Sequence, residues 1–189
     1  ALVAAMVCAW AVRLAGFLFV RVKRAGKDIR FDRVKANPST FLVWWTLQAL
    51  WVLTTMAAAL VIVTGGERVP MGWLGWIGVG VWLFGFVVEV VADAQKSAFR
   101  RDPANCGGFI QTGLWSWSRH PNYFGEIVLW SGVALISIPV LRGWQYATLI
   151  SPVFVAFLLM KMSGVPLLER KADERWGGQE EYEAYKAAT

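Results

Sequence analysis

Five long stretches of this chain are almost free of charged residues, and they limit what it can fold into. The stretch from Ala1 to Val20 is interrupted only by Arg13, and four others contain no charged residue: 41–66, 69–88, 127–141 and 143–160. A helix rising about 1.5 Å per residue needs about 20 apolar residues to cross ~30 Å of hydrocarbon. The pattern therefore predicts an all-α protein, a polytopic bundle of about five transmembrane helices.

The overall composition supports this fold class. Of the 189 residues, 57% are hydrophobic and 17% are charged, whereas soluble domains average ~45–50% and ~25%. We find no linker or internal repeat in the sequence, which predicts a single membrane-embedded domain over residues 1–189. Because Ala1 lies inside an apolar stretch, we also expect an N-terminal segment to precede it. Because the chain has only two cysteines, Cys8 and Cys106, and one histidine, His120, a metal site is not expected.

The Lys and Arg residues between the spans are unevenly divided. Sixteen of them fall in the first connection, the third connection and the C-terminal tail, which lie on one side of a five-span bundle; the other two connections contain only Arg68 and Arg142. Such an excess marks the cytoplasmic side of a membrane protein. We therefore expect this polar end, and any cofactor site on it, to face the cytoplasm. Nucleic acid is not an expected partner, because no recognised nucleic-acid motif accompanies these cations.

Ionisable residues follow one another at helical spacing where the third apolar stretch ends. Glu89, Asp93, Lys96 and Arg100 are separated by four, three and four residues, which places them on one stripe of a helix. Two carboxylates would then lie near the membrane and two cations would lie toward the cytoplasm. An ordinary salt-bridged helix end is the structural alternative. Because Glu89 lies inside an apolar segment, a functional role is favoured.

A second polar group is expected at the start of the next helix. The segment 102–113 contains Pro103 and several Gly residues, which exclude a continuous helix, and Pro121 suits the first turn of a new one. Asn122 and Glu126 then share one face of that helix, with Glu126 directed toward protein. Arg119 and the free N–H groups of the helix start favour an anion, such as a phosphate.

The residues after 162 form a polar, helical tail. Glu169 and Asp173 share a face there, and Tyr182 and Tyr185 follow near the end of the chain. By itself, such a charged segment is most often a solvated surface.

The polar segments together resemble a known family. Ser118-Arg-His-Pro-Asn-Tyr-Phe-Gly-Glu126, preceded by Ala92-Asp-Ala-Gln-Lys96 and followed by Ser163-Gly-Val-Pro-Leu-Leu-Glu169, resembles bacterial membrane proteins related to steroid 5-alpha-reductases. The resemblance covers essentially the whole chain. It implies a helical membrane bundle that binds NADPH from the cytoplasmic side of a bacterial inner membrane. The implied reaction is reduction of a carbon–carbon double bond in a lipid-like or steroid-like enone, with membrane lipid around the site.

The resemblance also implies roles for individual residues. Asn122 and Glu126 would hold the nicotinamide end of the cofactor, while Asp93, Arg100 and Glu89 would contact ribose and phosphates. The same stripe adds Lys96. Looser matches at the cytoplasmic surface are Arg119, Tyr123, Arg21 and Arg24. The tail would close over the cofactor through Glu169, Tyr182 and Tyr185.

Catalysis is predicted less securely than cofactor binding. Steroid reductases polarise the substrate carbonyl with a Glu and a Tyr from early helices, and in this chain the first tyrosine is Tyr123. The Glu would fall before Ala1, and the helix expected to carry the Tyr offers Trp10, Phe17 and Arg13 instead. The catalytic residue is therefore not assigned, and Glu126, Tyr123 and His120 are its candidates. A lone His before Pro is more often a turn residue than a catalyst.

Two other functions are compatible with the same residues. Isoprenylcysteine and phospholipid methyltransferases share the Arg-His-Pro-x-Tyr turn and an acidic tail, and they use S-adenosylmethionine; their paired Glu residues correspond here to Leu168-Glu169. The stripe through Asp93, Lys96 and Arg100 fits a nucleotide diphosphate better than a sulfonium cofactor. A membrane protein that binds lipid or a partner without chemistry is the third possibility. The sequence does not define the oligomeric state.

Overall fold

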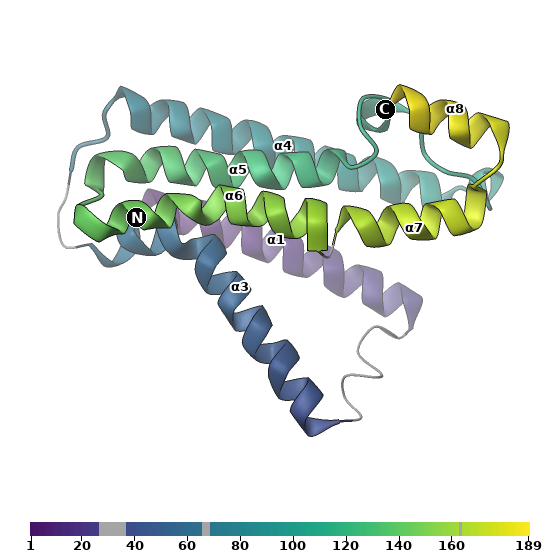
Figure 1. Ribbon diagram of the computed structural model, residues 1–189. Helices are drawn as coiled ribbons and strands as arrows, with labels where there is room; N and C mark the ends of the chain where they lie inside the picture. The colour runs from purple at the N-terminus through teal and green to yellow at the C-terminus, as the bar shows by residue number, and fades with distance from the viewer. Residues whose placement is uncertain (27–36, 66–68, 163) are drawn as a thin grey trace.

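The computed structural model describes residues 1–26, 37–65, 69–162 and 164–189, apart from the side chains of Arg24 and Ala25. Its described residues form helices and turns without any strand, as the apolar stretches predicted. Most of the long helices pack side by side in Figure 1, α7 continues in line with α6, and α8 lies at the same end of the bundle. The α-helices are α1 (Leu2–Ala25), α3 (Pro38–Thr64), α4 (Trp73–Arg101), α5 (Pro121–Ser137), α6 (Ile150–Phe157), α7 (Val165–Trp176) and α8 (Glu180–Ala188).

The expected number of spans is confirmed. Four helical segments are long and apolar enough to cross a membrane: Leu2–Lys23, Trp73–Arg101, Pro121–Val140 and Gly143–Trp176. The fifth, α3, is bent by 62° between Pro38–Thr55 and Ala57–Thr64. Its first part leaves the other helices in Figure 1. The buried residues of α3 are Thr55, at the end of the first part, and Ala58 and Ala59 in the second part.

Local sequence explains where the two helices of the polar stripe end and begin. α4 runs to Arg101 and stops because Asp102 precedes Pro103, which disfavours helical backbone at the residue before it. The Asp102 side chain instead accepts a hydrogen bond from the N–H of Ala104 and starts a short 3-10 turn. α5 begins at Pro121, where a missing N–H costs no hydrogen bond. The predicted break and the predicted helix start are both present.

Glycines bring the backbones of α4 and α5 into direct contact. A Cβ atom on Gly85 would lie 2.6 Å from the carbonyl oxygen of Gly125, and one on Gly132 would lie 2.7 Å from that of Gly78. A Cβ on Gly125 would also lie 2.7 Å from the backbone nitrogen of Glu89. The contact therefore places Glu89 of α4 beside the turn of α5 that carries Glu126.

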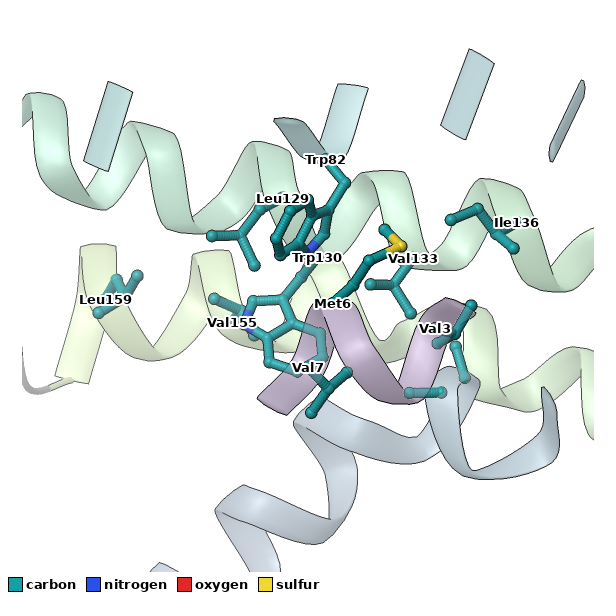
Figure 2. Close-up of a cluster of buried hydrophobic side chains, with 12 residues drawn as sticks. Val3, Met6, Val7, Trp82, Leu129, Trp130, Val133, Ile136, Val155 and Leu159 are labelled. Atoms are coloured by element: carbon teal, nitrogen blue, oxygen red, sulfur yellow. The ribbon is translucent and has the colours of Figure 1, made fainter. Parts of the chain in front are cut away.

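Two apolar clusters hold this pair of helices in place. In the larger cluster, Met6 and Val7 of α1 pack with Trp82 of α4 and Leu129 and Trp130 of α5 (Figure 2). The smaller cluster joins Ala92, Ile110 and Trp115, and the indole N–H of Trp115 donates to the carbonyl oxygen of Ala92 at 3.0 Å. The second cluster fixes the connection between α4 and α5 over the polar end of the bundle.

Replacing Gly85 with Ala should destabilise the protein by ~1–3 kcal/mol, because the new methyl group would be forced into the backbone of α5. Gly80→Ala is the matched control on the same helix, since a Cβ there has nothing within 4 Å. That change should be neutral or stabilising, by up to ~1 kcal/mol. Thermal unfolding in detergent measures both, and equal melting points for the two variants would contradict the close contact.

Candidate functional site

Two cavities meet at the polar end of the bundle. The first, which we call the helix cavity, has a volume of about 600 Å³ and lies among α1, α4, α5 and α7. The second, the tail cavity, has a volume of about 620 Å³ and lies between the end of α4, the α4–α5 connection and helices α7 and α8. Lys96, Arg100, Leu168 and Lys171 line both. An elongated ligand could therefore extend from one cavity into the other.

An arginine from α1 is held by two carboxylates of α4, Glu89 and Asp93, both of which line the helix cavity. Arg13 donates to Oε1 of Glu89 and to Oδ2 of Asp93, each at 2.5 Å, and to the carbonyl oxygen of Glu89 at 3.2 Å. Its guanidinium also lies 5.5 Å from the ring centroid of Phe17. The sequence analysis noted Arg13 only as an interruption of an apolar stretch. A charge inside a span requires a partner, so its position was a usable signal.

The carboxylates outnumber this arginine. Glu126 of α5 lines the same cavity and interacts electrostatically with both Glu89 and Arg13, yet among the described residues it forms no hydrogen bond or ion pair. Oε2 of Glu89 is buried and has no hydrogen-bond partner. Asn122, one turn before Glu126, also lines the cavity. This part of the site can therefore accept hydrogen bonds or positive charge from a ligand.

Basic residues occupy the other side of the helix cavity. Arg21 comes from the end of α1, Lys96, Arg100 and Arg101 from the end of α4, and Lys171 from α7. The ammonium of Lys96 lies 4.1 Å from the ring centroid of Trp115. Guanidinium and ammonium groups are the usual ligands of phosphates. The helix cavity is thus acidic at its inner end and basic where it joins the tail cavity.

Side-chain hydrogen bonds hold helices α7 and α8 over the tail cavity, and Glu169 of α7 contributes to them. Its carboxylate accepts from Nε of Arg119 at 3.1 Å and bonds Nε2 of His120 at 2.6 Å. Arg119 also donates to the carbonyl oxygen of Lys186 at 2.7 Å, and Tyr185 donates to that of Trp115 at 2.6 Å. The tail therefore closes over the cavity. Two of the predicted site residues, Glu169 and Arg119, are hydrogen-bonded to each other.

Aromatic rings line the closed tail cavity. Phe109 lies 5.6 Å from Trp176, 5.3 Å from Tyr182 and 5.5 Å from Tyr185, measured between ring centroids. Tyr182 donates to Oδ1 of Asp173 at 3.0 Å, and burial together with this hydrogen bond raises the pKa of Tyr182 to about 12. Tyr182 is therefore neutral at physiological pH. Its ring lines the tail cavity, and its hydroxyl group joins α8 to α7. Phe109 and Trp176 were not identified from the sequence.

The structure gathers the predicted site residues at these two cavities. Asn122, Tyr123, Glu126, Glu89, Asp93 and Arg21 line the helix cavity. Arg119, His120, Glu169, Tyr182 and Tyr185 line the tail cavity, and Lys96 and Arg100 line both. The side chain of Arg24 lies outside the described part of the chain.

The chain can now be compared with known proteins. The family model described as "Protein of unknown function (DUF1295)" matches residues 1–189. The chain belongs to the DUF1295 family. This family includes steroid 5-alpha-reductase-like proteins, in agreement with the resemblance seen in the sequence.

Three curated proteins show partial similarity to this DUF1295 chain. It is 32% identical over 102 residues to the Probable O-methyltransferase ustE of Ustilaginoidea virens, and 35% identical over 71 residues to 3-oxo-5-alpha-steroid 4-dehydrogenase 1 of Bos taurus. It is also 33% identical over 89 residues to the Uncharacterized protein C594.04c of Schizosaccharomyces pombe. These matches cover 54%, 37% and 38% of the chain, but only 36%, 27% and 26% of the respective relatives. No solved structure matches the chain.

Arg13→Met should destabilise the protein by ~3–5 kcal/mol, because it leaves Glu89 and Asp93 as uncompensated buried charges. Adding Glu89→Gln and Asp93→Asn should recover part of this loss. The control is Arg170→Met, whose partner Glu174 and own side chain are 61% and 79% exposed, and which should cost at most ~0.5 kcal/mol. Unfolding in detergent provides the measurement. Equal stability of Arg13→Met and wild type would show that the pair does not hold α1 to α4.

Stability should also depend on the protonation of His120. Burial lowers the pKa of His120 from 6.5, and the hydrogen bond to Glu169 offsets this only in part. Its buried Nδ1 has no hydrogen-bond partner, so adding a proton there is unfavourable in the folded state. The unfolded chain then binds this proton more readily, and stability falls as the pH drops below about 6.5. His120→Gln should weaken the dependence of the melting temperature on pH between 5 and 7.5. An identical pH profile for the variant would contradict this assignment.

Proposed function

We propose that this DUF1295 protein is a membrane-embedded oxidoreductase that uses NADPH to reduce a carbon–carbon double bond of a lipid-like or steroid-like enone. The observation that carries the proposal is the pair of adjacent cavities, with basic residues that line both of them between an aromatic pocket and an acidic inner end. A dinucleotide cofactor has matching parts: an adenine, charged phosphates and a nicotinamide. The partial similarity to the bovine steroid dehydrogenase points the same way.

The residues present fit this cofactor. Lys96, Arg100 and Lys171 lie where the cavities join and suit the phosphates. The rings around Phe109 suit the adenine, because they offer flat apolar surfaces. Asn122 and Glu126 suit the nicotinamide amide, which needs both an acceptor and a donor. The acidic inner end would repel phosphates. The charges of the cofactor therefore match those of the site only when the phosphates lie at the basic residues and the nicotinamide lies at the acidic end.

The chain's own residues then define the reaction site. NADPH, when bound, supplies a hydride from its dihydronicotinamide ring. The hydride adds to one carbon of the double bond, the π electrons move toward the carbonyl oxygen, and a proton from an acid or water adds to the other carbon. Tyr123 lines the helix cavity and is the candidate proton donor, whereas Glu126 lines it at the nicotinamide end. His120 is less suited, because its Nε2 is bonded to Glu169 and its Nδ1 is buried.

The sidedness of the basic residues supports a proposed location. Both cavities lie at the end that carries the basic residues of α1, α4 and α7. We infer that this end faces the cytoplasm, where NADPH is available, and that the protein resides in a bacterial inner membrane. Its substrate would enter from surrounding lipid, in a step of lipid metabolism.

A membrane methyltransferase is the second candidate function. The similarity to the Probable O-methyltransferase ustE covers more of the chain than that to the steroid dehydrogenase. S-adenosylmethionine would place its adenine among the same rings, and its sulfonium cation suits carboxylates. The basic junction favours NADPH, because S-adenosylmethionine carries no phosphate for Lys96, Arg100 and Lys171 to bind. A lipid- or partner-binding protein without chemistry is the remaining alternative.

Ligand-dependent melting of the detergent-purified protein tests the proposal. NADPH should raise the melting temperature, because a ligand that binds only the folded state stabilises it. Arg100→Gln should weaken NADPH binding roughly tenfold, and less at high salt, because phosphate contacts are screened. Arg170→Gln, outside both cavities, should bind as wild type does. A shift with S-adenosylmethionine alone would move the assignment to a methyltransferase, and no shift with any ligand would contradict both enzymatic proposals.

A further inference from the structure

Among the described residues, the inner end of the helix cavity has more carboxyl groups than cations. We call Glu89, Asp93 and Glu126 the acidic end; these three carboxyl groups surround the single guanidinium of Arg13. Glu89 is only 3% exposed, and its Oε2 has no hydrogen-bond partner in the described part of the chain, although the residue lines the cavity. A buried carboxylate oxygen without a partner costs free energy. The cavity beside it leaves room for a ligand group that would provide one.

The other described cations of the helix cavity do not neutralise Glu89 and Glu126. Lys96 and Arg21 interact electrostatically with Asp93, which lies nearest to the basic junction. For Glu89 and Glu126, Arg13 is the one cation that contributes appreciably among the described residues. Arg13 directs its two shortest contacts to Glu89 Oε1 and Asp93 Oδ2, and none to Glu126. The uncompensated charge therefore lies on the side of the cavity shared by Glu89 and Glu126.

We propose that the acidic end recognises a positively charged group of the bound ligand, so that the protein binds the oxidised, cationic nicotinamide cofactor more tightly than the reduced, neutral one. This inference rests on the proposed function. The two cofactor forms have the same phosphates and the same adenine, so the basic junction and the tail cavity cannot distinguish them. Only the end of the site that meets the nicotinamide can.

The charge preference has a consequence for the direction of chemistry. Loss of a hydride, which carries two electrons and one proton, turns the neutral dihydronicotinamide ring into a ring with one positive charge. Carboxylates that stabilise this charge make the bound cofactor a stronger reductant. For a two-electron couple, each tenfold preference for the oxidised form lowers the reduction potential of the bound couple by ~30 mV. A double bond that resists reduction would require such a donor.

The test compares the affinities of the two cofactor forms by titration calorimetry on the detergent-solubilised protein. Wild type should bind NADP⁺ more tightly than NADPH. Glu126→Gln should reduce this preference by at least tenfold, as expected for a unit charge within about 10 Å at an effective dielectric constant of ~20. Because Glu126 forms no ion pair with any residue that the structure describes, the variant should fold. Glu89→Gln is the second variant and should act in the same direction.

The matched control is Glu174→Gln, which removes one negative charge from an exposed position on α7. It should leave the preference unchanged. Equal binding of the two forms by wild type would overturn the inference, as would an unchanged preference in both Glu126→Gln and Glu89→Gln. In either case NADPH binding itself would still support the proposed function.

A second pair of probes separates the inference from the choice of cofactor. S-adenosylmethionine is a sulfonium cation, and S-adenosylhomocysteine is the neutral compound left after methyl transfer. If neither nicotinamide form binds, the proposed reductase function fails. Tighter binding of S-adenosylmethionine than of S-adenosylhomocysteine, lost in Glu126→Gln, would then still support a cation site. The absence of any charge preference in both pairs would overturn it.

Discussion

The closest contact between α4 and α5 is made between their backbones, and the position of the site depends on it. Four glycines let the two helices approach so closely that a methyl group added to any of them would collide with backbone atoms of the other helix. Glu89 lies at one end of this contact and Glu126 at the adjacent turn of the other helix. Two acidic residues from helices that are separate in sequence are therefore held together without a hydrogen bond between them. In lipid, where apolar association gives little driving force, such close packing is what joins helices.

Much of the fold could be predicted because its signals are local. Runs without charge marked the spans, spacing placed Glu89, Asp93, Lys96 and Arg100 on one stripe of α4, and Pro121 marked the start of α5. The pairing of Arg13 with α4 was not predicted, because it joins residues 76 and 80 positions apart. The bend of α3 was also missed, since its sequence is apolar on both sides of the bend.

The sequence predicted which residues would lie at the candidate site better than it predicted the contacts between them. Asn122, Glu126 and the stripe of α4 do line one cavity. The tail residues were expected to contact a cofactor, yet Glu169 bonds Arg119 and His120, and Tyr185 bonds the backbone of Trp115. Sequence spacing cannot show such contacts, because α7 and α8 reach the α4–α5 connection only through the folding of the whole bundle. The charge of the cavity, acidic inside and basic at the junction, likewise emerges only when α1, α4, α5 and α7 are assembled.

The ion pair of Arg13 also bears on how the protein is made. An arginine near the middle of a span costs about 2.5–3.5 kcal/mol on insertion into the bilayer. The partners that offset this cost belong to α4, and Glu89 is synthesised 76 residues after Arg13. During synthesis, α1 therefore lacks the partners that stabilise Arg13 in the bilayer, and it is stabilised there only when α4 inserts beside it. Insertion and assembly are thereby coupled into one event for the first half of the chain.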